Sequence, residues 1–374
     1  MRKTRIYGII AALNSLPKVI LDLVLEYDFY IHGIKKYELL TDINSEYSNI
    51  IGLNKQFLVY ILFSQYPSIQ ILEEKNGEKF LYNEEIIHNI KITSDKSKLI
   101  ISTFYDLYIY DLITNKFLTR ILTTSIHIEI LSDDNESLKI ISVNTFDNQL
   151  SILTFNKYNN EMSKESYLIP NINGILIISP IKILTFSNEN TIYSWDYINN
   201  KLCFDKKYKL DLNFRYDYRI HIKNLIIMSD HGHHKKYILT ILNSNTMEKI
   251  IDILVKYLIV SLSSIDDDYV IYFTNICDTK TSISNTKVFI LNLNTYETEE
   301  ILTNYRILKF YTILPNKEIV FVSRFETHDS IIIYNILTKI ETSFQINSKI
   351  SSLTLTSDTC IALLTNNSII EIYE

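Results

Sequence analysis

Hydrophobic and polar residues alternate along most of this chain, and the alternation returns in a repeated unit. Three stretches share one pattern: LYIYDLITNK from Leu107, IYSWDYINNK from Ile192 and SIIIYNILTK from Ser330. In each, an alternating run leads to an aromatic residue, which is followed by Asp or Asn and then by a polar turn. A period of two predicts half-buried β-strands. The sequence therefore predicts a protein built from many short strands.

The repeated unit has a regular length. Alignment on the aromatic residue extends to weaker copies and gives eight marker positions: Leu72, Tyr110, Leu153, Trp195, Leu242, Leu291, Tyr334 and Tyr373. Successive markers are 38, 43, 42, 47, 49, 43 and 39 residues apart. Such a period, with alternation inside each unit, is typical of β-propeller blades and not of helical solenoids. We therefore predict an all-β, eight-bladed propeller, with seven blades as the alternative because the unit before Glu74 is the least regular.

Turn signals fall at the expected phase between the markers. A Ser or Pro followed by Asp or Asn joins two apolar runs in ITSDKSKLIIS from Ile92, ILSDDNESLKIIS from Ile130, ILPNKEIVFVS from Ile313 and LTSDTCIALL from Leu355. Asp and Asn close tight turns by bonding to nearby backbone, so each unit is predicted to hold four strands. The last unit stops at its third strand, at Tyr373, and would expose a strand edge. The alternating segment from Lys35 to Thr41 is predicted to supply the missing strand and close the ring.

These units resemble the blades of WD-repeat β-propellers, whose third strand often ends in Trp-Asp. Trp195-Asp196 is the one full match, and Tyr110-Asp111 and Tyr334-Asn335 are near matches. The resemblance covers residues 34 to 374, although no Gly-His dipeptide precedes the blades. It implies a non-catalytic scaffold that binds a protein or peptide. A plainer interpretation of Trp195 is that it is a core residue between neighbouring blades.

The first residues differ in kind from the rest, so we divide the chain into an N-terminal arm, 1–33, and a propeller, 34–374. The stretch SLPKVILDLVLEYDFY from Ser15 predicts a short amphipathic helix, with a capping Ser, a Pro in the first turn and apolar residues at helical spacing. Its contact residues are Leu16, Pro17, Ile20 and Leu23. This stretch resembles the beginning of an F-box, which implies docking on a ubiquitin-ligase adaptor and a role as substrate receptor. Similar proteins occur in large DNA viruses. The alternative is a helix that packs against the ring.

Charge and cysteine content narrow the possible settings. The net charge of −6 argues against a general affinity for nucleic acid, which requires basic faces. Cys203, Cys277 and Cys360 are far apart and odd in number, which favours a reduced intracellular setting. No stretch approaches the ~20 apolar residues of a membrane-spanning helix. We expect a monomeric cytoplasmic protein, in the host cytoplasm if it is viral.

Candidate chemistry in the sequence is sparse. DHGHHKK from Asp230 offers imidazoles and a carboxylate, but it is predicted to be a solvated loop, and no metal site is expected. The run Asp266 to Asp268 falls at a predicted inner hairpin turn and lacks the spaced ligands of a calcium loop. No glycine-rich phosphate loop or nucleophile elbow is present, so no cofactor and no enzyme activity are expected. The alternative function is a propeller enzyme with its active site at the central channel.

The partner site is predicted from loops and from arginine. Loops joining the second to the third strand, and each blade to the next, share one face of a propeller, and loops on a rigid scaffold carry recognition. Arginine is scarce here, and its planar donor fork suits carboxylate or phosphate. We therefore expect Arg215, Arg306, Arg324 and Phe325 to contribute to a site for an acidic or phosphorylated peptide. The alternative is that they are solvated or form ordinary surface ion pairs.

Overall fold

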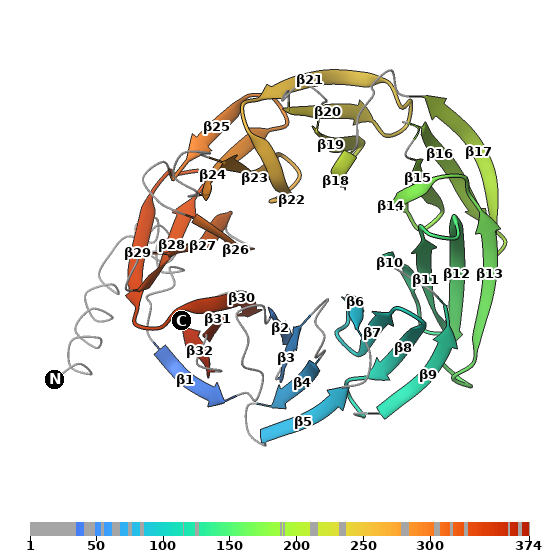
Figure 1. Cartoon of the computed structure of the whole chain (residues 1–374), viewed down its shortest axis with the longest axis horizontal. Coiled ribbons are helices and arrows are strands. Elements are labelled where there is room, and N and C mark those ends of the chain that lie inside the picture. The colour runs from blue at the N-terminus through green and yellow to red at the C-terminus, as the bar shows by residue number, and fades with distance from the viewer. Residues whose placement is uncertain are drawn as a thin grey trace, which may run out of the picture.

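Antiparallel strands make up the regular structure of this protein. The computed structural model describes residues 35–40, 49–53, 56–61, 68–73, 77–82, 86–114, 116–123, 127–187, 189, 191–209, 216–231, 237–277, 284–302, 307–314, 317–324, 328–357, 360–365 and 369–373. Within these residues, 32 strands form four-stranded sheets, eight in number, and no helix is present. The sheets stand around a ring with their first strands innermost and their fourth strands outermost (Figure 1).

Seven of the sheets are blades made of four consecutive strands. They are β2(Asn49–Leu53) β3(Gln56–Ile61) β4(Ser68–Glu73) β5(Gly77–Tyr82); β6(Ile87–Ile92) β7(Lys98–Thr103) β8(Asp106–Asp111) β9(Lys116–Leu122); β10(His127–Asp133) β11(Ser137–Asn144) β12(Gln149–Asn156) β13(Met162–Leu168); β14(Ile172–Ser179) β15(Lys182–Ser187) β16(Thr191–Ile198) β17(Lys201–Lys209); β18(Tyr216–Ile222) β19(Leu225–His231) β20(Tyr237–Asn243) β21(Lys249–Val255); β22(Leu258–Ser264) β23(Tyr269–Cys277) β24(Ser284–Asn292) β25(Thr298–Ile301); and β26(Ile307–Ile313) β27(Glu318–Arg324) β28(Asp329–Asn335) β29(Glu341–Ile346).

The remaining sheet is a composite of the two ends of the chain. Its first three strands are β30(Ile350–Ser357), β31(Cys360–Thr365) and β32(Ile369–Tyr373), and its outer strand is β1(Lys35–Leu40). β1 runs antiparallel to β32, with Leu40 opposite Ile369 and Lys35 opposite Tyr373. The segment predicted to close the ring therefore does pair with the last strand, as Figure 1 shows near the C-terminus.

The predicted fold class needs correction. It counted eight blades and included a short N-terminal helix, whereas the described residues hold seven continuous blades, one composite closing sheet and no helix. Only seven blades are continuous because the last unit has three strands of its own, and its fourth strand is β1 from the other end of the chain. The helix residues Leu16, Pro17, Ile20 and Leu23 lie outside the described residues.

All eight marker residues occupy one structural position. Each lies on the third strand of its sheet and pairs with an apolar residue near the start of the second strand; Tyr110 faces Leu99, Trp195 faces Ile183, and Tyr334 faces Ile319. Because side chains of a strand alternate between its faces, this register places the apolar positions between neighbouring blades. One such cluster joins Ile100 and Leu107 of one blade to Leu138 and Phe155 of the next. The core is thus divided among the blade interfaces.

The residue after the marker explains the Asp or Asn of the repeated pattern. The Asp111 carboxylate accepts the amide protons of Ile113 and Thr114, both at 2.8 Å, and thereby closes the turn to β9. Asn243, Asn292 and Asn335 close their turns in the same way. The full Trp-Asp match differs because its turn is the two-residue Asn199-Asn200, with φ values of 52° and 63°. Asparagine adopts this left-handed region more readily than most residues. The chain has six glycines, and in this turn asparagine takes the positions that glycine often occupies.

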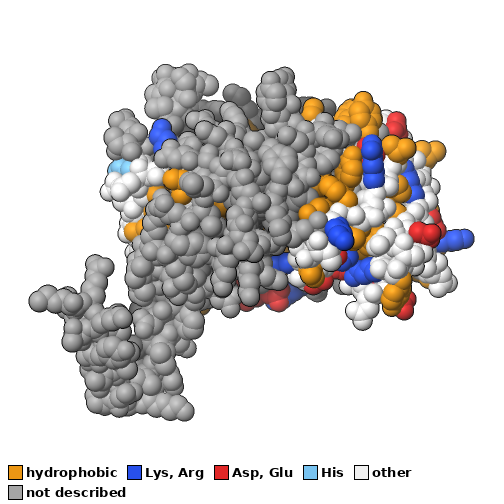
Figure 2. Space-filling view, turned by 90° about the horizontal axis from the view of Figure 1, so that it is seen from below, with side chains coloured by type: hydrophobic (Ala, Val, Ile, Leu, Met, Phe, Trp, Pro, Cys, Tyr) orange, Lys and Arg blue, Asp and Glu red, His pale blue; other side chains and the backbone are white. Residues whose placement is uncertain are grey.

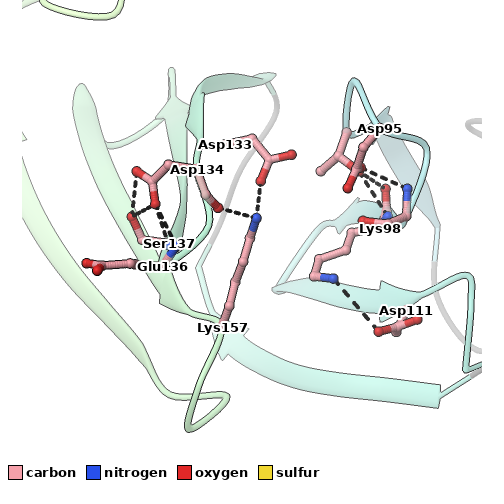
Figure 3. Close-up of polar contacts among 10 residues, drawn as sticks. Asp95, Lys98, Asp111, Asp133, Asp134, Glu136, Ser137 and Lys157 are labelled. Atoms are coloured by element: carbon pink, nitrogen blue, oxygen red, sulfur yellow. Dashed lines mark hydrogen bonds and ion pairs between the residues drawn. The ribbon is translucent and has the colours of Figure 1, made fainter.

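Ion pairs and hydrogen bonds hold the first turns of the blades. In the β10–β11 turn, the Asp134 carboxylate accepts the amide protons of Glu136 and Ser137 at 2.9 and 2.7 Å. Lys157, from the outer turn of the same blade, binds Asp133 at 2.6 Å. Figure 3 shows these contacts beside the Asp95 turn of the preceding blade. The turn face, which carries the first-to-second and third-to-fourth turns, is therefore cross-linked by polar contacts.

Candidate interaction face

The opposite face carries the second-to-third loops and the connections between blades, and we call it the connection face. On this face the loop between β7 and β8 presents Phe104 and Tyr105, and the loop between β11 and β12 presents Phe146. Their exposed fractions are 41%, 60% and 71%. The Phe104 ring lies 4.8 Å from Tyr105 and 6.5 Å from Phe146, centroid to centroid. These three side chains, from two neighbouring blades, form the aromatic patch.

A β-bulge places a histidine beside the aromatic patch. The register of β6 against β7 shifts between Ile87 and Asn89, and His88 lies at this shift. A bulge re-aims the side chain of its extra residue, and the His88 imidazole lies 5.7 Å from the Phe104 ring. Burial lowers the pKa of His88 below its usual range. The neutral imidazole therefore extends the patch toward the inner strands at neutral pH.

The two loops of the patch are held by short polar side chains. The Thr103 hydroxyl accepts the Asp106 amide and donates to the Asp106 carbonyl, both at 3.1 Å. In the other loop, the Asn144 side-chain oxygen accepts the Phe146 amide at 2.9 Å, and its amide group donates to Asp147 at 2.6 Å. Such turns fix the backbone locally. The aromatic side chains are therefore presented on ordered loops, which lowers the entropy cost of binding.

A buried carboxylate anchors the β7–β8 loop. Asp106 is fully buried, and its carboxylate accepts a hydrogen bond from the Arg120 guanidinium on β9 at 2.5 Å. The guanidinium also lies over the Tyr108 ring, 5.5 Å from its centroid, and more than half of the Arg120 side chain is exposed. Removing one partner of a buried charge pair leaves an uncompensated charge. Arg120 therefore holds Asp106, the residue that directly follows Phe104 and Tyr105 in the loop.

Polar side chains on the innermost strands of four neighbouring blades interact with one another. Lys91 of β6 forms an ion pair with Glu129 of β10 at 2.8 Å. Arg219 of β18 donates to the side-chain oxygen of Asn173 on β14 at 3.1 Å, and its guanidinium lies 4.5 Å from the Phe186 ring centroid. Asn173 is itself the extra residue of a bulge. The sequence did not reveal this set, because its members are far apart along the chain.

His127, at the start of β10, belongs to this inner set. Solvent reaches the His127 side chain, but desolvation by the surrounding protein lowers its pKa; the positive charges of Arg219 and Lys91 lower it further, and the nearby Glu129 charge opposes them. The imidazole is therefore neutral at neutral pH and offers one donor and one acceptor. Among the described residues, no group of three or more His, Cys, Asp or Glu side chains has a metal-binding arrangement.

The residues predicted for the partner site are only partly described. Arg324 is the last residue of β27, where its backbone pairs with Asp329, and its side chain is outside the described part. Arg215, Arg306 and Phe325 lie outside the described residues altogether. Their role stays a prediction. Asp230 and His231 end β19, while the other two histidines of that stretch are also outside the described part.

The acidic run at Asp266 lies in the predicted inner hairpin turn and joins three blades. The Asp266 carboxylate binds Lys317 of the following blade at 2.6 Å, and Asp268 binds Lys223 of the preceding blade at 3.3 Å. Burial opposes ionisation of Asp266, but the hydrogen bond from Lys317 and the backbone amides lower its pKa. This run therefore has a structural role on the turn face.

Comparison with known proteins finds similar solved structures but no similar sequence. No protein-family model and no curated protein sequence matches the chain. Among solved structures, it is similar to Sqt1 of Saccharomyces cerevisiae, with a TM-score of 0.65, 10% identity, and coverage of 91% of this chain and 98% of that one. The chain has a WD40-like β-propeller fold. The Dos1 propeller (TM-score 0.62, 9% identity, 91% and 95% covered) and the WD40 domain of SCAP from fission yeast (0.59, 10%, 90% and 97%) agree.

The fold also occurs in a catalytic setting. The dihydro-heme d1 dehydrogenase NirN matches with a TM-score of 0.57 and 8% identity, over 78% of this chain and 64% of that one. At such identities the likeness concerns the fold alone. The described residues include no helix long and apolar enough to cross a membrane.

The sequence held one signal for the aromatic patch. Both of its loops place aromatic residues between a Thr and an Asp, in TFYD from Thr103 and TFD from Thr145. The prediction weighted arginine and loop length instead, and so favoured other blades. Only the ring brings the two loops side by side.

Proposed function

We propose that this protein is a non-catalytic interaction scaffold that binds a protein or peptide partner on its connection face. The aromatic patch of Phe104, Tyr105 and Phe146 carries the proposal, because exposed apolar clusters on a folded surface mark interaction sites. Aromatic residues are enriched at the centres of such sites. The similarity to WD40 propellers supports a scaffold role.

The test compares two faces of the ring. Phe104→Ala with Phe146→Ala removes most of the aromatic patch, and Tyr158→Ala is the matched control, since Tyr158 is 75% exposed in the β12–β13 turn on the opposite face. Cross-linking in native cells, followed by mass spectrometry, identifies proteins held by each variant. We expect that some proteins are captured by the wild type and by Tyr158→Ala but not by the double variant. Identical capture by all three variants would contradict the proposal.

A finer proposal is that the scaffold is a substrate receptor for ubiquitin ligation. It rests on the F-box-like residues Leu16, Pro17, Ile20 and Leu23 of the N-terminal arm. Changing Leu16, Ile20 and Leu23 together to Asp should abolish copurification of a ligase adaptor while capture through the aromatic patch persists. An adaptor that still copurifies with this triple variant rules the F-box proposal out.

The site of action is proposed to be the cytoplasm, or the host cytoplasm if the protein is viral. The proposal rests on three widely spaced cysteines, which favour a reducing compartment. Fractionation of cells that express the tagged full chain tests it. Recovery mainly in the secreted or organelle fraction would contradict it.

A propeller enzyme is the second candidate function. The convergence of Lys91, His127, Glu129, Asn173 and Arg219 at the inner strands favours it, because a catalytic site needs several polar groups in one place. The test measures turnover of a panel of hydrolase and oxidoreductase substrates. Turnover by the wild type that is lost in His127→Ala would support this function. Turnover that persists in His127→Ala argues against the inner set as its source.

A further inference from the structure

The outermost strand of the fourth continuous blade has an open edge. β17 is nine residues long, from Lys201 to Lys209, and no other strand among the described residues pairs with its outer edge. Figure 1 shows it running along the outside of the ring. The amide of Leu202 donates to the Tyr167 hydroxyl of the preceding blade at 3.0 Å. Backbone N–H and C=O groups on the outer edge of β17 therefore point away from the blade, where another strand could form hydrogen bonds with them.

The charge of this edge is opposite to that of the whole chain. Four exposed lysines and one aspartate give the strand a formal charge of 4 − 1 = +3, whereas the chain carries −6. Within the described part of the chain, none of Lys201, Lys206, Lys207 and Lys209 forms an ion pair, while Asp205 is bonded by the Ser194 hydroxyl at 3.1 Å. Lys182 also approaches Asp205, at 3.8 Å.

The same edge exposes an aromatic anchor. The Phe204 side chain is 56% exposed, and its ring lies 5.4 Å from Trp195, edge to face. Lys207 lies on the same side of the sheet, with its ammonium 5.5 Å from the Tyr193 ring centroid. A bound segment with an apolar side chain packed against Phe204 would therefore have lysine ammonium groups of β17 close to its neighbouring residues.

We infer that β17 binds an extended acidic segment of a partner protein by strand addition, from Cys203 to Lys209. The backbone of the segment would bond the outer edge of β17, its carboxylates would pair with Lys206, Lys207 and Lys209, and an apolar residue would cover Phe204. Edge lysines also keep like strands apart. The two roles agree, since lysines that repel another basic edge attract an acidic one. This surface is separate from the aromatic patch.

Phe204, Lys207 and Lys209 lie on one face of β17 and Lys206 lies on the other, so the binding test uses the peptide Glu-Thr-Glu-Glu-Val-Thr-Glu, which presents carboxylates on both faces. The peptide has blocked ends and is compared with a copy N-methylated at alternate amides. N-methylation removes the strand-forming hydrogen bonds and keeps the charges. We expect the first peptide to bind and the second to bind at least about tenfold more weakly. Amide hydrogen exchange of Cys203 to Lys209 should slow only with the first peptide. Equal binding of the two peptides would show that only charge is recognised and would overturn the inference.

Charge variants separate this edge from the rest of the surface. Lys206→Glu with Lys207→Glu should weaken the peptide about tenfold or more. Lys116→Glu with Lys256→Glu makes the same charge change at two exposed lysines on other blades and should have little effect. Equal losses in the two variants overturn the inference. Binding of anionic phospholipid vesicles that depends on Lys206 and Lys207, without protection of β17 amides by the peptide, also overturns it.

Discussion

The indole N–H of Trp195 donates a hydrogen bond to the hydroxyl oxygen of Thr185 at 2.9 Å, and so joins the third strand of its blade to the second. Thr185 is fully buried, and Trp195 is half-buried against a cluster that includes Leu131 and Ile183 of two neighbouring blades. The interpretation of Trp195 as a core residue between blades is therefore confirmed. Its polar group also has a partner, which a residue buried at such an interface requires.

Breaking that bond should destabilise the protein modestly. Thr185→Val removes the acceptor and leaves the indole N–H without it, so the free energy of unfolding should fall by about 1–2 kcal/mol. Trp195→Phe removes the donor. In urea unfolding, the double variant should be more stable than the sum of the single losses implies, by about 1 kcal/mol. Strict additivity would show that the bond contributes nothing.

Replacing Gly174 should destabilise the protein because it displaces the Arg219 side chain. A Cβ atom at Gly174 would lie 2.2 Å from a terminal nitrogen of Arg219, so in Gly174→Ala the guanidinium must move away from Asn173 and Phe186. The hydrogen bond and the cation–π contact together suggest a loss of about 1–2 kcal/mol. The Arg219→Ala variant supplies the control, because in that background Gly174→Ala should cost much less. A cost that is the same in both backgrounds would contradict this account.

Acid should weaken the β6–β7 turn. Burial opposes ionisation of Asp95, but hydrogen bonds from the Thr93 hydroxyl and from Ser97, with the charge of Lys98, lower its pKa to about 2 from an ordinary 3.8. A carboxyl whose folded pKa is lowered stabilises the fold above its unfolded pKa, and this stability is lost as the pH falls from about 4 toward 2. Asp95→Asn should therefore lose less of its stability over that range than the wild type does. Urea midpoints measured at several pH values check this, and parallel curves would contradict it.

Ring closure depends on β1. A chain that lacks Lys35 to Thr41 should have a lower melting temperature, because the edge of β32 loses its bonded neighbour. Adding the peptide KKYELLT in trans should restore part of the loss, whereas the same peptide with a central proline should not, since proline removes a backbone donor. An unchanged melting temperature after the deletion would show that β1 does not hold the ring closed.

Local pattern determined the strands and their register. Alternation and turn residues placed the markers Tyr110, Trp195 and Tyr334 on third strands, because side chains of a strand must alternate between its two faces. The pairing of the first alternating segment with the last strand was also predictable, since an unpaired edge needs a partner. The role of Asp111 and Asn335 in closing turns follows from the same local chemistry.

Only the tertiary structure decided which loops meet and which side chains share a site. Phe104 and Phe146 come from different blades, as do Asn173 and Arg219, and their contacts depend on the angle between blades and on bulges such as the one at His88. Alternation within a strand carries no information about that angle, which is set by side-chain packing between sheets. The aromatic patch and the inner polar set therefore had no complete signature in the sequence, whereas the strands beneath them did.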